Sequence, residues 1–252
     1  MLFDTHTHLN DDRLAPEIES IVSQMSDKGL SHIMNVGYDT PSSIIAVEQS
    51  TLYDNVYASI GIHPHDSKSA TKKDYDLFVK LAENKKVKAY GEIGLDFYYD
   101  LSERDIQERV FIEQLELADT LKLPVIFHVR DAYGLAYEIL KEHKSLLKNG
   151  GVMHCYQSSK EMLGGFLDLG LHIAFGGAIT FKNAKKDDIV KAVPIDRLLL
   201  ETDCPYMTPV PFRGKTNYPE YVALVRDKIC EWRNEDIETI TTQNAKRVFR
   251  IE

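Results

Sequence analysis

Histidines and carboxylates in this chain of 252 residues stand at the ends of short apolar segments. The first segment ends in His6-Thr7-His8, and because side chains alternate along a strand, both histidines project to one side and can share a metal ion. Other segments end at further ligand-type residues: Glu92, His128, His154 and Asp203. Four imidazoles and two carboxylates suffice for two divalent cations, and Glu92 can bridge them because a carboxylate has two oxygens. The donor set predicts a metal site.

Isolated histidines are interpreted differently. His32, His143 and His172 share a strand end with no other donor, so we expect hydrogen-bonded core or surface residues there. An HxH pattern by itself is also a weak signal. Six candidate ligands at the ends of five separate strands form a much more specific pattern.

Strand alternation also sorts the neighbours of the candidate ligands. If His154 points inward, Cys155 points outward and is expected to pack rather than to ligate. Glu201 has the parity of Asp203 and would lie one step deeper, where it either orients a metal ligand or is simply a buried, hydrogen-bonded carboxylate. The three cysteines are far apart and include no CxxC, which predicts neither a disulfide framework nor a structural zinc motif.

Eight apolar segments are predicted as strands, and segments of helical period separate them. The expected strands cover residues 2–6, 32–37, 56–62, 87–92, 125–128, 152–155, 171–175 and 197–201. Thr40-Pro41 is interpreted as an N-cap followed by proline at the first helical position. Ser102-Glu103-Arg104-Asp105 resembles an acidic capping box before a helix with one apolar face.

Strict alternation of strands and helices predicts parallel pairing, and eight units in about 250 residues fit a closed (β/α)8 TIM barrel of the α/β class. An open, doubly wound sheet is the alternative, but no GxGxxG turn follows the first strand. No repeat or linker divides the chain, so we expect a single domain over residues 1–252. The candidate ligands stand at carboxyl ends of strands, where barrel enzymes assemble their sites.

The composition, 43% hydrophobic and 27% charged, is typical of a globular protein with a sizeable core. No apolar run approaches the roughly 20 residues of a membrane span, and the start does not resemble a signal peptide, so we expect a cytoplasmic protein. A net charge of −9 argues against a binder that coats phosphates with a basic surface. An enzyme that handles phosphate locally remains compatible with it.

Longer sequence blocks resemble the TatD-type deoxyribonucleases of the amidohydrolase superfamily. The blocks are DTHTHLN at 4–10, GIHPH at 61–65, GEIGLDFYY at 91–99, PVIFHVRDA at 124–132, HCY at 154–156, TFKNAKK at 180–186, LLLETDCPYMTPVPFRGKTN at 198–217 and NAKRVF at 244–249. They follow one another in the family's order. One departure is Gln157-Ser158-Ser159, where the family commonly has Ser-Gly after HCY, and it concerns substrate preference rather than the metal centre.

The resemblance implies a barrel that holds two divalent cations, Mg, Mn or Zn, and hydrolyses phosphodiesters, usually in DNA. Its metal ligands would be His6, His8, Glu92, His128, His154 and Asp203, with Glu92 bridging. His65, in preference to His63, and Arg130 would contact the substrate phosphate. We assign catalysis to Asp203 and Glu92, and Asp203 either accepts the proton of the attacking water or acts only as a ligand.

Several side chains on the same face have two interpretations. Arg130 either grips phosphate bidentately or pairs with Asp131 or Glu138. Lys182 and Arg213 are assigned to substrate binding. Together with Lys185, Lys186 and Lys215 they form either a basic rim around the site or simply a solvated face. Aromatic residues at 98, 99 and 212 either stack on bases or pack.

The leading functional hypothesis is an exonuclease that shortens single-stranded DNA ends, with DNA as its partner and no membrane association. The 3′ to 5′ polarity and the strand preference come from the resemblance alone. A metallohydrolase of a small amide, ester or phosphoester is the second hypothesis, because the same centre could activate water for any of these substrates. The third is a non-catalytic nucleic-acid or protein-binding module, and the complete ligand set argues against it.

Overall fold

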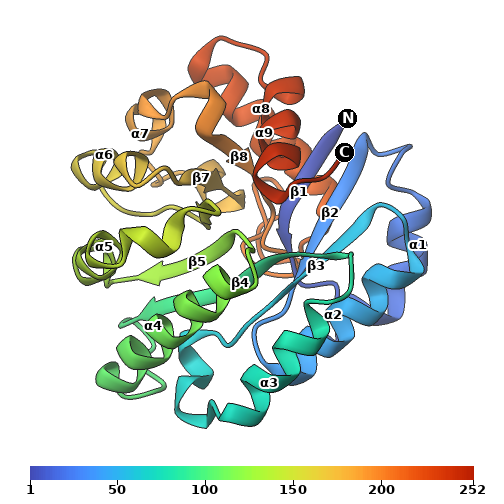
Figure 1. Ribbon diagram of the computed structural model, residues 1–252. Helices are drawn as coiled ribbons and strands as arrows, with labels where there is room; N and C mark the ends of the chain where they lie inside the picture. The colour runs from blue at the N-terminus through green and yellow to red at the C-terminus, as the bar shows by residue number, and fades with distance from the viewer.

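The computed structural model describes residues 1–252, and its eight strands form one sheet in the order β1 to β8 (Figure 1). The strands are β1 (Leu2–Thr7), β2 (Leu30–Val36), β3 (Val56–Ile60), β4 (Val87–Asp96), β5 (Val125–Arg130), β6 (Gly151–Met153), β7 (His172–Phe175) and β8 (Leu198–Leu200). Each strand pairs in parallel with the next. Thr7 forms a parallel bridge with Cys204 just after β8, which brings the two edges of the sheet together. The predicted (β/α)8 barrel is confirmed, and the open sheet is wrong.

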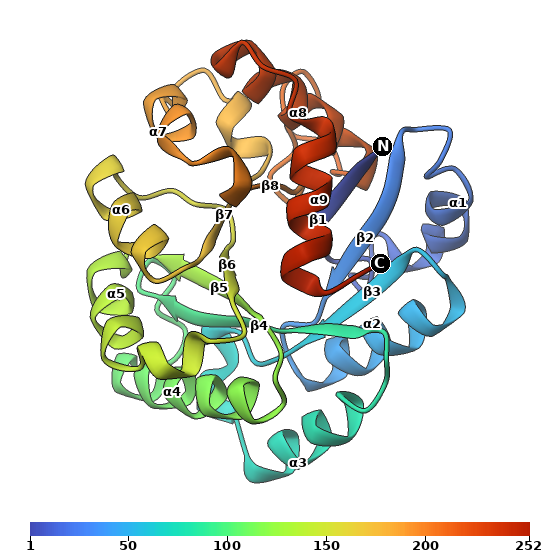
Figure 2. The ribbon, with the colours of Figure 1, turned by 45° about the horizontal axis from the view of Figure 1, so that its top comes forward.

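Helices surround the strands on the outside of the barrel, except the last one, which lies across one end of it (Figures 1 and 2). They are α1 (Ile18–Ser23), α2 (Thr40–Leu52), α3 (Lys72–Leu81), α4 (Arg104–Thr120), α5 (Tyr133–Glu142), α6 (Lys160–Asp168), α7 (Asp187–Ala192), α8 (Val222–Arg233) and α9 (Glu238–Phe249). Short 3-10 turns join them: η1 (Ala15–Glu17), η2 (Pro64–Ser69), η3 (Lys144–Leu147), η4 (Gly177–Thr180), η5 (Ile195–Arg197) and η6 (Pro219–Tyr221). No helix combines the length and apolarity that crossing a membrane requires.

The inside of the barrel is filled by side chains rather than open. One buried cluster joins inward-facing residues of the strands, among them Phe3, Met34 and Leu199, to residues of the last helix, α9. The ring of Phe249 from α9 lies 6.0 Å from the ring of Phe3 near the start of β1. Because α9 and this cluster close the amino-terminal end of the barrel, polar chemistry is confined to the carboxyl ends of the strands.

The start of α2 differs slightly from the expectation. Asp39, not Thr40, is the N-cap: its carboxylate accepts from the N–H of Ser42 at 2.7 Å. The hydroxyl of Ser42 in turn accepts from the N–H of Asp39 at 2.9 Å. The helix therefore begins with a reciprocal capping box, and Thr40 and Pro41 are its first two residues.

The expected capping box at the start of α4 is wrong. The hydroxyl of Ser102 donates to the carbonyl of His65 at 2.8 Å and accepts from the N–H of Lys68 at 3.1 Å. No side chain caps α4 at Glu103. Acceptors and donors in η2, distant in sequence, compete with the local cap, so Ser102 ties the loop after β4 to the turn after β3.

His172, at the start of β7, is buried, but neither of its ring nitrogens has a hydrogen-bond partner with normal geometry. The expectation of a hydrogen bond here is wrong. Burial, and then the nearby guanidinium groups of Arg197 and Arg247, lowers the pKa of His172 to about 4. A protonated imidazole is therefore disfavoured in the folded chain.

This environment predicts a pH-dependent stability. Between the ordinary His pKa of about 6.5 and the lowered value of about 4, the unfolded chain binds more protons, so the free energy of unfolding falls as the pH decreases. Replacing His172 with Leu should make the decrease in the free energy of unfolding between pH 7 and pH 4.5 smaller by about 2 kcal/mol. Urea unfolding at both pH values measures this difference. EDTA is present throughout, so that release of bound metal does not contribute to the pH dependence. Parallel pH profiles for the two proteins would contradict the assignment.

Candidate metal centre

The six predicted ligands meet at the carboxyl end of the barrel. His6 lies in β1 and His8 directly after it, Glu92 in β4 and His128 in β5. His154 and Asp203 follow β6 and β8. Their imidazole and carboxylate atoms form overlapping groups within 4.8 Å of one another, so the fold gathers all six predicted ligands in one place.

One group lies on the β1 and β8 side of the site. The Nε2 atoms of His6 and His8 are 3.3 Å apart. Oδ1 of Asp203 lies 3.4 Å from Nε2 of His8 and 3.9 Å from Nε2 of His6. Two imidazoles and a carboxylate that converge at these distances can share one cation.

Glu92 stands between this group and a second one, which consists of His128 and His154. Its Oε2 lies 3.4 Å from Nε2 of His6, on the side of the first group. Its Oε1 lies 2.7 Å from Nδ1 of His128 and 3.7 Å from Nε2 of His154. One carboxylate oxygen therefore faces each group, as the predicted bridging role requires.

Two of the four imidazoles are hydrogen-bonded at their rear nitrogen, and a third has a carboxylate next to it. Nδ1 of His8 lies 3.1 Å from the carbonyl oxygen of Val36. Nε2 of His128 lies 3.1 Å from Oδ2 of Asp96, and Nδ1 of His154 lies 3.0 Å from Oε1 of Glu201. An acceptor at the rear nitrogen holds the proton there and leaves the front lone pair for a metal. The donor set therefore fits divalent cations.

The charges at the site also suit cations. Burial would raise the pKa of Glu92, but the imidazoles of His6 and His154 hold it well below its usual range. Burial opposes charge on His154, yet the carboxylates of Glu201 and Glu92 raise its pKa to about 10. Without a metal, ionised carboxylates thus pair with imidazolium groups, and a cation that replaces the proton satisfies the same carboxylates.

The contacts of Glu201 combine features of its two interpretations. Its carboxylate is fully buried, and besides facing His154, its Oε1 accepts from the N–H of Cys155 at 2.6 Å. Glu201 therefore lies beside His154 as a charge partner, without the geometry of a hydrogen bond, and its own hydrogen bond is to the N–H of Cys155.

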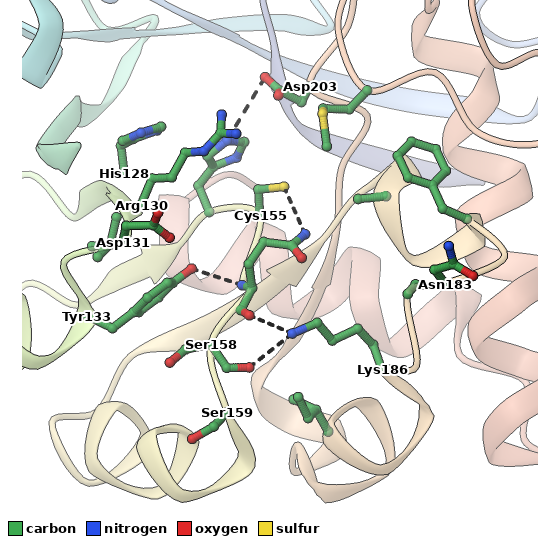
Figure 3. A pocket seen from close by; sticks show the side chains of 18 of the residues that line it. His128, Arg130, Asp131, Tyr133, Cys155, Ser158, Ser159, Asn183, Lys186 and Asp203 are labelled. Carbon is green, nitrogen blue, oxygen red and sulfur yellow. Dashed lines mark hydrogen bonds and ion pairs between the residues drawn. The ribbon is translucent and has the colours of Figure 1, made fainter. Parts of the chain in front are cut away.

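The expectation that Cys155 points away from the site is wrong. Strand β6 ends at Met153, and Cys155 has a left-handed backbone with φ of 44°. Alternation does not extend through such a residue, so the thiol lines the cavity beside His154 (Figure 3).

Asp96 is a site residue that the sequence reasoning missed. It is fully buried, and its Oδ2 lies 3.1 Å from Nε2 of His128 and 2.9 Å from Nε2 of His65. Its Oδ1 accepts from the backbone N–H groups of Tyr98 and Tyr99 at 3.0 and 2.9 Å. Asp96 shares the parity of Glu92 in β4, and this was the available signal. Since Asp96 engages Nε2 of His65, only Nδ1 of that residue is available to a substrate.

A cavity of about 940 Å³ opens beside the ligands (Figure 3). His128, His154 and Asp203 form one end of it, and the loops after β5, β6, β7 and β8 form its walls. Four cationic side chains line it, Arg130, Lys182, Lys186 and Arg213, while Asp131 and Asp203 are its carboxylates. The site is thus locally basic although the chain carries a net charge of −9.

Arg130 forms no ion pair, so the alternative of a bridge to Asp131 or Glu138 is wrong. Its guanidinium carbon lies 3.9 Å from the ring centre of Tyr98 and 4.8 Å from that of Tyr99. The two tyrosines hold the guanidinium by cation–π contact and leave its N–H groups free for an anion. The aromatic faces that meet Arg130 are not available to a base.

The remaining cations differ in what they contact. Lys186 donates to the carbonyls of Gln157 and Ser158 at 2.5 and 3.1 Å, so it anchors the loop that departs from the family pattern. Arg213 lies over the ring of Phe181 at 4.3 Å. Lys185 and Lys215 do not line the cavity. Phe212 packs, since its ring stacks on that of Tyr221 with centres 4.8 Å apart.

The family model described as TatD related DNase matches residues 3–250. This chain belongs to that family. TatD-family relatives match along its whole length: an uncharacterized metal-dependent hydrolase, YabD of Bacillus subtilis, is 44% identical over 255 residues and 100% of both chains. The predicted family is therefore confirmed.

Two further comparisons agree. The crystal structure of the TatD homolog YjjV of Escherichia coli K12 superposes with a TM-score of 0.94 at 30% identity, covering 100% of this chain and 98% of that one. The 3′-5′ ssDNA/RNA exonuclease TatD of Salmonella typhimurium is 29% identical over 260 residues, covering 99% of each chain. The protein is a metal-dependent hydrolase of the TatD family.

Proposed function

We propose that this TatD-family hydrolase removes nucleotides from the 3′ ends of single-stranded DNA, using two divalent cations and one domain that spans residues 1–252. The observation that carries the proposal is the basic cavity that opens from the ligand groups of an otherwise acidic chain. Cations confined to one cavity suit a substrate whose phosphates enter the site. The name of the Salmonella relative supports the strand preference and polarity.

The chain's own residues divide the work. His6, His8 and Asp203 would hold one cation, His128 and His154 the other, and Glu92 both. Bound there, Mg²⁺, Mn²⁺ or Zn²⁺ supplies an activated water and neutralises charge on the phosphoryl oxygens. A set rich in imidazole favours zinc or manganese in the purified protein.

Asp203 is the proposed proton acceptor. It lies at the edge of the cavity, and its side chain is 15% exposed against 5% for that of Glu92. A water that attacks from the cavity can therefore reach this carboxylate, while Glu92 is enclosed between the imidazoles. We assign to Asp203 the transfer of the water's proton.

The cavity walls would hold the substrate. Arg130, with its N–H groups unpaired, is placed to bind a phosphate bidentately. Lys182 and Arg213 line the cavity from the loops after β7 and β8 and would contact further phosphates. His65 would reach a phosphate oxygen through Nδ1. A recessed site that is reached through a cavity favours an unpaired end over a duplex.

A cleavage assay tests this function. Apo-protein is incubated with 5′-end-labelled single-stranded DNA alone, and with added Mg²⁺, Mn²⁺ or Zn²⁺. We expect stepwise shortening from the 3′ end that requires a cation and is slower on a blunt duplex of the same sequence.

A parallel panel of small esters, cyclic amides and phosphomonoesters distinguishes the second hypothesis. The nuclease would be rejected if folded, cation-loaded protein left DNA intact with every cation but hydrolysed a member of the panel. The protein would then be a small-molecule hydrolase.

A further inference from the structure

His63 is a buried histidine beside the ligand groups that the predicted ligand set does not include. It follows β3 and is 8% exposed. Its ring lies edge-on to the rings of His65 and His128, with centres 4.2 Å away in both cases. Its Nε2 faces Oε1 of Glu92, the oxygen that also faces His128.

The backbone sets the tautomer of this imidazole. Nδ1 of His63 accepts from the N–H of His65 at 3.2 Å and thereby caps the 3-10 helix η2. A neutral imidazole has one lone pair and one N–H. Because the lone pair at Nδ1 is used by the cap, the hydrogen is on Nε2.

That N–H has no acceptor within the protein. Its nearest carboxylate oxygen, Oε1 of Glu92, is 3.9 Å away, too far for a hydrogen bond. This oxygen already lies 2.7 Å from Nδ1 of His128. Nε2 of His63 is not among the buried polar atoms that lack a partner, so this donor is open to the space beside the ligand groups, where an oxygen of a bound molecule can accept from it.

We infer that His63 is a catalytic residue that donates a hydrogen bond from neutral Nε2–H to a phosphoryl oxygen of the substrate. The inference rests on the proposed phosphodiester hydrolysis. A fixed donor aimed at developing negative charge stabilises the transition state without itself losing a proton. His65 cannot take this role through Nε2, which Asp96 engages.

A ligand role for His63 is the competing interpretation, because its ring nitrogen groups with Glu92 and His128. Ligation through Nε2 would require the lone pair there and would move the hydrogen to Nδ1. It would then point at the N–H of His65, and the cap of η2 would be lost. With the hydrogen on Nε2, by contrast, Nδ1 keeps its lone pair and the cap of η2 is preserved.

Two substitutions separate these roles. The side-chain amide of His63→Gln reaches about as far as Nε2 and can donate, but it does not reproduce the cap at Nδ1. The shorter His63→Asn reproduces the cap, since Asn is a favoured N-cap residue, but its amide stops short of the ligand groups. Cation content, thermal unfolding, binding of inorganic phosphate, and hydrolysis of DNA and of a nitrophenyl phosphodiester are compared for both variants.

We expect both variants to keep their cations. His63→Asn should lose about 10²- to 10³-fold in kcat and bind phosphate more weakly, and His63→Gln should recover much of both. If His63→Asn turned over like the wild type while His63→Gln were impaired, the role of His63 would be only to cap η2. Loss of a cation in both would make it a ligand. Either result overturns the inference.

The tautomer is tested independently of turnover. Long-range ¹H–¹⁵N spectra of histidine-labelled, zinc-loaded protein should show His63 protonated at Nε2 and unprotonated at Nδ1, and the reverse pattern would refute the donor. If the wild type cleaves no phosphodiester, the proposed function fails. The tautomer and the phosphate affinities of the two variants still decide whether His63 is a donor to a bound oxyanion.

Discussion

Replacing Glu92 with Gln is expected to lower phosphodiester hydrolysis by about 10³-fold or more, a loss of several kcal/mol in transition-state stabilisation. The glutamate presents Oε2 to His6 at 3.4 Å and Oε1 to His128 at 2.7 Å. The amide of glutamine keeps one oxygen and presents an N–H₂ group, which cannot ligate, to the other side. The volume of the side chain is unchanged, so the packing around it should persist.

Cation content and kcat, measured on the same preparation, test this expectation. The Gln variant should lose at least one cation per chain while its circular dichroism stays that of the wild type. Glu138→Gln is the matched control, because Glu138 is an exposed residue of α5 whose charged contact is a 3.9 Å surface pair with Lys141. A Glu92→Gln protein that keeps both its cations and its turnover would remove Glu92 from the site.

The Asp203→Asn variant should keep at least one cation but lose about 10²- to 10⁴-fold in kcat, the range that general acid–base groups contribute. An asparagine oxygen can still face His8, where Oδ1 of the aspartate lies 3.4 Å from Nε2. The amide cannot accept a proton from water at neutral pH. Binding and proton transfer are thereby separated at one residue.

Single-turnover rates and cation content measure the effect of Asp203→Asn. Asp131→Asn serves as the control, since Asp131 lines the same cavity without belonging to the ligand groups. Its backbone φ of 52° is one that asparagine also adopts, so the control should fold normally. Full turnover in Asp203→Asn would show that Asp203 is only a ligand.

The barrel and the location of the site followed from local rules. Periods of two and 3.6 residues marked strands and helices, and their strict alternation implied parallel pairing. His6 and His8 share a face in any extended strand, and the carboxyl ends of barrel strands necessarily meet. Six ligand-type residues at such ends could therefore be placed together without knowledge of any contact, although metal binding by them stays a prediction.

Where the chain leaves regular geometry, local rules were insufficient. Alternation placed the Cys155 thiol outside the barrel, but β6 ends at Met153 and the left-handed backbone at Cys155 turns the thiol into the cavity. Ser102 stands in a sequence typical of an N-cap. Its hydroxyl nevertheless donates to the carbonyl of His65 in η2, because this carbonyl from another loop lies within hydrogen-bond distance. Local patterns do not contain the positions of distant acceptors.

By itself, the sequence determined the type of fold, the face that carries the site and the residues available as ligands, because these depend on periodicity and strand order. Only the tertiary structure decided how those ligands are held: His8 by the carbonyl of Val36 and His128 by Asp96, with the carboxylate of Glu201 beside His154. It also decided that Arg130 stacks on tyrosines instead of pairing with an acid. The physical reason is that hydrogen-bond direction and charge pairing depend on atoms brought within about 3 Å by folding, which sequence spacing does not specify.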